Sequence, residues 1–165
     1  MVPEKRLRQL ANLGSALADL AQGDLQTAKR DALFLKAVQE AREMTGAAYS
    51  SLGLVEGDVI HWLSADGKPL YEVQGRKQPV TEGLCGWVVR CGRSRRTGNV
   101  TGEADYYEQY AEMQSELDVP LKVGERVIGV LSMESPVARA FDVEHEHLME
   151  VVAQFLAIAL AASAS

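Results

Sequence analysis

The acidic side chains at positions 116, 118 and 134 are the group in this sequence best placed to bind a ligand. Glu116 and Asp118 alternate with apolar residues in the segment 115–121, and Glu134 follows a second apolar run at 127–131. The Gly-containing turn between the two runs predicts a β-hairpin that brings both polar clusters to the same end of a sheet. A buried carboxylate needs a positive or hydrogen-donating partner to offset its desolvation. The acids therefore predict a ligand with a cationic or donor-rich group.

Strand alternation determines whether these acids face the ligand. Glu116 and Asp118 share one face of their strand, whereas Ser115 shares the other face with apolar residues. The acids face the ligand only if the apolar set packs under helices, and this is the arrangement we expect. If the acids face solvent, the pocket is apolar and the arginines at the start of an adjoining strand, Arg95 and Arg96, select an anion instead. Ser115 and Arg96 are both retained as candidate ligand-binding residues.

Cys85 is the residue with the clearest potential for redox chemistry. It lies in Gly-Leu-Cys-Gly at an expected helix start, where backbone amide dipoles would lower the pKa of the thiol. A thiol–disulfide reaction also needs a second thiol within reach, but Cys91, six residues along the same helix, points elsewhere around its axis. A small buried core cysteine is the alternative. We expect Cys85 to line the ligand pocket and expect no catalytic residue.

Aromatic residues complete the predicted pocket. The segment 105–110 contains three tyrosines, whose apolar rings and polar tips suit a loop that closes over a ligand. A short amphipathic helix docked on the sheet edge, with the tyrosines as packing residues, is an equally good interpretation. In a further expected strand, either His61 or Trp62 faces the sheet interior. The aromatic residues predicted to bind ligand are Trp62, Tyr106, Tyr107 and Tyr110.

Hydrophobic periodicity places a sheet between helices. Leucines spaced by threes and fours in residues 5–22 predict a helix with a narrow apolar seam, which we expect to contact a second chain. A second helix is expected from Asp24 to Met44, and a broadly apolar one after the N-cap Asp142. The expected strands cover 48–55, 58–63, 70–73 and 95–100, in addition to the hairpin. This order predicts an α+β fold, with an antiparallel sheet covered by helices on one face and ligand-enclosing loops on the other.

These segments, taken in order, resemble the GAF domain, a small-molecule-binding module of cyclic-nucleotide phosphodiesterases, phytochromes and many bacterial signalling proteins. The resemblance covers about residues 30–162. It is carried by EGLCGWVVRCG (82–92), RRTGNV (95–100), SELDVPL (115–121), VIGVLSMES (127–135) and the spacing from Phe141 to Leu148. It implies a sensory domain that binds a small molecule and signals through its terminal helices at a homodimer interface. The domain expected is 24–165, preceded by a dimerisation or signalling helix at 1–23.

The chain also resembles free methionine-R-sulfoxide reductases, which are stand-alone GAF proteins of about this length. The resemblance implies that Glu116 and Glu134 occupy the positions of that family's substrate-binding acids. It departs from the family in two places: no cysteine precedes Ser115, and Ser132 stands where the family has an acid. A divergent reductase and a fold kept only for dimerisation therefore remain the alternatives to a sensor. The identity of the ligand and the presence of an output domain or partner signalling protein are left open.

Composition narrows the class of protein. The net charge of −6 argues against nucleic acid as a partner, because phosphate binding needs a basic surface. No run reaches the ~18–20 apolar residues that cross a bilayer, and the N-terminus does not resemble a secretory signal. Two cysteines do not make a disulfide framework, so a cytoplasmic location is expected. His145 and His147 point to different helix faces, so no metal site is expected.

Overall fold

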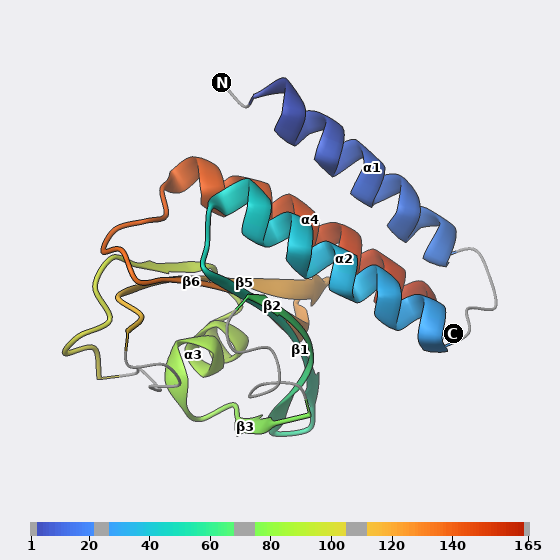
Figure 1. Ribbon diagram of the computed structural model, residues 1–165. Helices are drawn as coiled ribbons and strands as arrows, with labels where there is room; N and C mark the ends of the chain where they lie inside the picture. The colour runs from blue at the N-terminus through green and yellow to red at the C-terminus, as the bar shows by residue number, and fades with distance from the viewer. Residues whose placement is uncertain (1–2, 22–26, 68–74, 105–111, 164–165) are drawn as a thin grey trace.

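The computed structural model describes residues 3–21, 27–67, 75–104 and 112–163, and it places one antiparallel sheet between helices (Figure 1). The strands are β1 (Tyr49–Glu56), β2 (Val59–Gly67), β3 (Lys77–Pro79), β4 (Arg95–Thr97), β5 (Ser115–Val123) and β6 (Arg126–Ser135). The helices are α1 (Glu4–Ala21), α2 (Thr27–Thr45), α3 (Gly83–Cys91) and α4 (Val143–Ser163). The strand order is β3-β2-β1-β6-β5-β4. The predicted α+β class and the single antiparallel sheet are confirmed.

The hairpin β5–β6 forms the centre of the sheet together with β1. Its register pairs Ser115 with Ser135 and Val123 with Arg126, around a turn in which Gly124 has a positive φ of 60°. The turn sequence therefore carries out the chain reversal expected from it. Because β6 pairs with β1 on one side and β5 on the other, the acidic end of the hairpin lies well inside the sheet rather than at its edge.

Two helices, α2 and α4, cover one face of the sheet, and α3 covers the other (Figure 1). The larger core lies under α2 and α4, where Leu117 and Val119 of β5 are fully buried against helix residues such as Val152. The smaller core lies between the sheet and α3 and includes Trp62 and Cys85. The condition for inward-facing acids is thus met, because the apolar side of β5 packs under helices.

Helix α1 packs on α4 of the same chain, whereas we expected little of this domain to be left for its seam to cover. Leu13 and Leu17 are fully buried in the larger core. Gly14 allows close approach, since a Cβ there would lie 2.9 Å from the Phe155 ring of α4. Leu7, near the N-terminus, is half-exposed. A role of residues 1–23 in dimerisation stays a prediction.

Most element boundaries agree with the expected ones to within a few residues. The N-cap at Asp142 is confirmed, because its Oδ1 accepts a 2.9 Å hydrogen bond from the His145 amide. Only residues 95–97 of the expected strand 95–100 pair with β5. Strand β3 was not expected, and the predicted extended segment 70–73 lies outside the described residues. Among the helices that the structure describes, none is both long and apolar enough to cross a membrane.

Candidate functional site

Two glycines place Cys85 at the start of α3. Gly83 has a φ of 77°, in the left-handed region that side chains disfavour, and so lets the chain turn into the helix. Gly86 lies so close to the preceding loop that a Cβ there would sit 2.6 Å from the Val80 carbonyl oxygen. The Arg90 side chain donates a 2.5 Å hydrogen bond to the same oxygen. The Gly-Leu-Cys-Gly motif therefore fixes the helix against the loop and turns the thiol toward the sheet.

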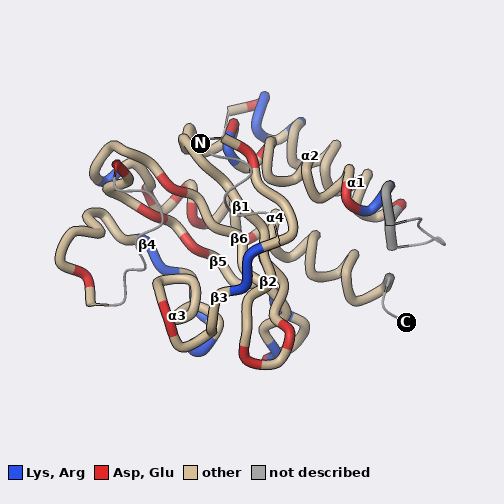
Figure 2. The backbone as a smooth tube through the Cα atoms, turned by 60° about the horizontal axis from the view of Figure 1, so that its bottom comes forward, with Lys and Arg blue, Asp and Glu red and all other residues tan. Residues whose placement is uncertain are grey.

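The sheet face under α3 carries rows of polar side chains. One row is formed by Ser51 of β1, Ser132 of β6 and Asp118 of β5, which lie opposite one another in register. In the next row Glu134 of β6 lies opposite Glu116 of β5. Figure 2 shows the acidic segments of β5 and β6 side by side. Because alternate residues of a strand share a face, all of these side chains project toward α3.

These polar rows border a small cavity between the sheet and α3. Its volume is about 20 Å³, enough for a single water molecule. Trp62 forms part of the wall, and its indole Nε1 donates a 3.3 Å hydrogen bond to Gln78 Oε1. The cavity is lined by Ser51, Trp62, Gln78, Leu84, Cys85, Glu116, Ser132 and Glu134. A ligand larger than water therefore requires the cavity to widen.

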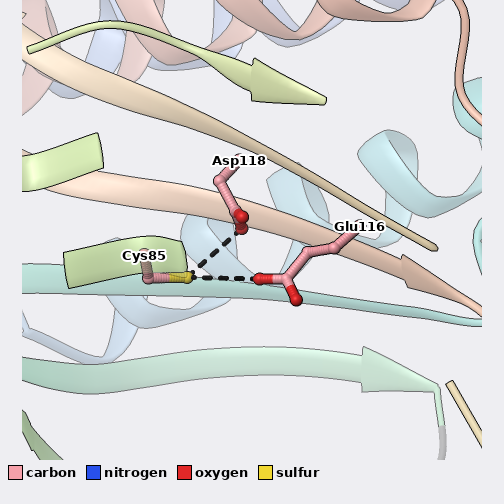
Figure 3. Close-up of side chains that lie close together, drawn as sticks. All are labelled: Cys85, Glu116 and Asp118. Atoms are coloured by element: carbon pink, nitrogen blue, oxygen red, sulfur yellow. Dashed lines mark hydrogen bonds between the residues drawn. The ribbon is translucent and has the colours of Figure 1, made fainter. Parts of the chain in front are cut away.

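The thiol of Cys85 lies against two carboxylates (Figure 3). Its Sγ is 3.2 Å from Asp118 Oδ1 and 3.7 Å from Glu116 Oε1. All three side chains are buried, with Asp118 completely inaccessible. A thiol, two carboxyls and the nearby Glu134 thus share one desolvated environment.

Burial makes the charged forms of these groups unfavourable. Burial, then the charge of Asp118, then that of Glu134, raise the pKa of Glu116 well above its ordinary range. Burial raises the pKa of Asp118 as well. Burial, with the charge of Asp118, raises the pKa of Glu134 to about 8. Part of this acidic group is therefore protonated at neutral pH.

The same environment overturns the expected activation of Cys85. Burial, followed by the charges of Asp118 and Glu116, raises the pKa of its thiol well above the ordinary value. The expectation of a lowered pKa was wrong because it weighed the helix amides alone. The sequence alone does not indicate that two acids from β5 pack directly on the thiol.

Of the residues predicted to bind ligand, Trp62, Cys85, Glu116 and Glu134 line the cavity. Asp118 does not line it but contacts the Cys85 thiol. The structure does not bring Ser115 or Arg96 there.

Ser115 lies on the helix side of β5, where its hydroxyl donates a 2.6 Å hydrogen bond to the Val137 carbonyl. Arg96 also points to the helix side and lies 3.6 Å from Glu146 of α4. Both residues therefore tie loops and strands to the helical layer. The predicted residues Tyr106, Tyr107 and Tyr110 lie outside the described residues.

Arg95, not Arg96, is the arginine of β4 on the side of the cavity. It lies opposite Asp118 in register, and its guanidinium stacks 4.9 Å from the centre of the Trp87 ring. It also donates a 3.0 Å hydrogen bond to Glu103. The period of two along a strand decides between neighbouring arginines, and applying it from Asp118 across the sheet would have selected Arg95.

Ser51 and Gln78 are cavity residues that sequence reasoning did not identify. Ser51 belongs to a strand that is otherwise largely apolar, and a buried polar residue in such a strand is a signal of a site. Gln78 lies in the short strand β3, and its Nε2 donates a 3.0 Å hydrogen bond to the Glu82 carbonyl before α3. No periodicity in the sequence marks a strand of this length.

Comparison with known proteins connects this architecture with one family. The sequence model of one protein family, the GAF domain, matches residues 27–161. Protein YtsP of Bacillus subtilis is 32% identical over 83 residues, so that the match spans about half of each chain. The similarity to solved structures under 25% identity establishes the shared fold only.

Two solved structures illustrate that fold. A free methionine-R-sulfoxide reductase from Neisseria meningitidis, in complex with its substrate, superposes with a TM-score of 0.81 at 23% identity, covering 99% of this chain and 95% of that chain. The GAF domain of an Acinetobacter phosphoenolpyruvate-protein phosphotransferase superposes with a TM-score of 0.80 at 17% identity, covering 98% and 96%. Since the family model spans most of the sequence and the structure has the same fold, this chain belongs to the GAF domain family.

Proposed function

We propose that this protein is a sensory or regulatory GAF domain that binds a small molecule with a cationic or donor-rich group between the sheet and α3. The observation that carries the proposal is the burial of three acids in one place: Glu116 and Glu134 line the cavity, and Asp118 is buried against the Cys85 thiol. Like charges in a desolvated site repel one another, and a bound cation relieves that repulsion. The scale of these interactions is about 4 kcal/mol for two unit charges 4 Å apart near a protein surface.

Ligand binding would act on the helices through strand β5. Glu116 and Asp118 alternate along β5 with Leu117 and Val119, which pack in the larger core against α4. The cavity holds about one water, so a ligand must bind a state in which α3 and the sheet stand further apart. A ligand that prefers this state shifts the population toward it. A displacement of β5 would then move Leu117 and Val119, and with them the contact between β5 and α4.

A homodimer is the second part of this proposal, and α4 supplies the surface for it. Val143, Val151 and Ile158 are 51%, 42% and 53% exposed and fall within one arc of the helix. Because Leu13 and Leu17 of α1 are already covered, this stripe on α4 supplies the larger share of the contact expected of the two terminal helices. An output domain or partner signalling protein would receive the signal from these helices.

Light scattering at micromolar concentration should give about twice the 18.0 kDa chain mass. Ile158→Lys introduces a charge into the stripe and should weaken the dimer by at least about tenfold. The matched control is Val137→Lys, which places the same charge at a 63% exposed valine in the loop after β6. A wild-type chain that scatters as a monomer would remove the dimer from the proposal.

Thermal-shift screening tests the ligand class. Amines and amino acids should raise the melting temperature, by roughly 5–10 °C at saturating concentration, because binding to the folded state alone stabilises it. Glu116→Gln should abolish the shift, whereas Arg96→Ala should leave it unchanged. Stabilisation by nitrate, phosphate or carboxylates alone, lost in Arg96→Ala and kept in Glu116→Gln, would contradict the proposal.

A divergent sulfoxide reductase is the second candidate function. It is favoured by the placement of Cys85, Glu116 and Glu134 at one cavity in a fold shared with free methionine-R-sulfoxide reductases. It is disfavoured by the position of Cys91, which is exposed at the far end of α3 and is a free thiol. Such an enzyme needs a resolving thiol within disulfide reach. A domain kept only for dimerisation is the outcome if no small molecule binds.

A further inference from the structure

When both acids are ionised, the contact between Cys85, Glu116 and Asp118 has more hydrogen-bond acceptors than donors. One ligand-type atom from each residue lies within 4.8 Å of the other two. The thiol carries one hydrogen, so it can donate to only one of the two carboxylates that approach it at 3.2 and 3.7 Å. The cluster is therefore incomplete as a set of hydrogen bonds between ionised acids and a thiol.

An orphaned oxygen within the cluster points to the same deficit. Asp118 Oδ2 is fully buried and has no hydrogen-bond partner among the described residues. Buried polar atoms are normally satisfied, and each exception calls for an explanation. A positive centre beside the acids would supply one.

We propose that Cys85, Glu116 and Asp118 bind a divalent transition-metal ion of the zinc class, with the remaining coordination position facing the cavity. The inference rests on the proposed function, because it names the cation that these acids accept in the same pocket. The ligands come from two elements, α3 and β5, that converge only in the folded chain (Figure 3).

The spacing of the three ligand atoms suits such an ion. With a metal–sulfur distance of 2.3 Å and metal–oxygen distances of 2.0–2.2 Å, tetrahedral geometry sets each sulfur–oxygen separation at about 3.5 Å. The two separations found, 3.2 and 3.7 Å, lie on either side of that value. Small side-chain adjustments would therefore complete the site.

The donor set also selects among metals. A thiolate with two carboxylate oxygens suits Zn²⁺, Co²⁺ or Fe²⁺, which accept mixed sulfur and oxygen ligands. Mg²⁺ and Ca²⁺ prefer six or more oxygen ligands and do not use thiolate. Three protein ligands leave one position for water or a bound small molecule, as in zinc sites that exchange a ligand. The hydroxyls of Ser51 and Ser132 and the Glu134 carboxyl line the cavity that a fourth ligand would occupy.

A second group on the surface serves as the control. Glu146, His147 and Glu150 of α4 also place ligand-type atoms within 4.8 Å of one another, but His147 and Glu150 are exposed. Exposed acidic groups of this kind commonly occur without a metal, and among the described residues no orphaned buried atom belongs to this group. Metal bound there would lack a thiolate ligand.

The test uses the full chain, treated with chelator and then titrated with Zn²⁺ or Co²⁺. We expect one equivalent to bind tightly, and the Co²⁺ form to show a thiolate-to-metal charge-transfer band in the near ultraviolet. Cys85→Ser should abolish that band, and Asp118→Asn, a near-isosteric change, should weaken binding by at least about 100-fold. Cys91→Ser and His147→Ala should retain both the band and the affinity.

The wild-type spectrum keeps the proposal falsifiable even if a variant fails to fold. Absence of the charge-transfer band at one equivalent of Co²⁺ would overturn it, as would binding that survives Cys85→Ser and disappears in His147→Ala. The thermal-shift screen with amines distinguishes failure of the metal site from failure of the proposed function. If amines stabilise the chelator-treated protein and Zn²⁺ does not, the metal site is wrong and the proposed function stands; if neither binds, both fail.

Discussion

The free energy of unfolding of the metal-free protein should fall as the pH rises from about 5 to about 8. Glu134 carries much of this effect, because its pKa is raised from 4.5 to about 8 in the folded chain. Between these values the folded state keeps a proton that the unfolded state has lost, so deprotonation favours unfolding. Each unit of pKa difference corresponds to about 1.4 kcal/mol, so the part of this shift that falls between pH 5 and 8 is worth on the order of 3–4 kcal/mol.

The raised pKa values of Glu116 and Asp118 act in the same direction. Asp142 has a lowered pKa and acts in the opposite sense, but it lies on the surface and its effect is confined to more acidic conditions. The measurement is urea unfolding in the presence of a chelator at several pH values between 5 and 8. Glu134→Gln should flatten the profile substantially, since the amide cannot ionise. A wild-type protein that becomes more stable over this range would contradict the assignment of these acids to a desolvated site.

Cys91 should react with a thiol reagent at least about 1000-fold faster than Cys85 in the native protein. Cys91 is exposed, whereas Cys85 is buried and has a raised pKa, so that little of its thiol is ionised or accessible. Cys85 should react only when the region around α3 opens, and a factor of 1000 corresponds to an opening free energy of about 4 kcal/mol. Ellman's reagent applied to Cys91→Ser and Cys85→Ser isolates each thiol in turn. Rapid modification in Cys91→Ser would show that Cys85 is accessible.

The same chemistry bears on catalysis. A protonated and shielded Cys85 without a nearby resolving thiol should give no turnover of free methionine-R-sulfoxide with a thiol reductant. A rate that disappears in Cys85→Ser and survives in Cys91→Ser would restore the reductase. The reactivity of Cys85 therefore decides between the sensor and its enzymatic alternative.

Much of the fold could be predicted from the sequence because local patterns, such as strand alternation and a helix cap, agree with the burial that the structure shows. Glu116 and Asp118 alternate with Leu117 and Val119, and the structure shows that this alternation separates a polar face from a core face. Asp142 is followed by a long apolar helix, as its capping role predicts. Local patterns of this kind predict the observed elements because packing over several residues stabilises each of them.

The site was less predictable because it depends on contacts between elements. The approach of Cys85 to Asp118 arises where α3 docks on β5, and no pattern in either segment gives the distance. Arg96 was chosen over Arg95 because the pairing of β4 with β5 was not known, and one step of register reverses the face of every side chain. The covering of Leu13 and Leu17 by α4 depends equally on tertiary packing.

The small volume of the cavity also has a kinetic consequence. A space of about 20 Å³ admits no ligand beyond the size of water, so association of a larger ligand would have to wait for the cavity to widen. The observed association rate then stops rising with ligand concentration and levels off at the rate of opening, which belongs to the protein. Ligands of different affinity would share this plateau and differ only in how long they remain bound. Selectivity between such ligands would then lie in their dissociation rates.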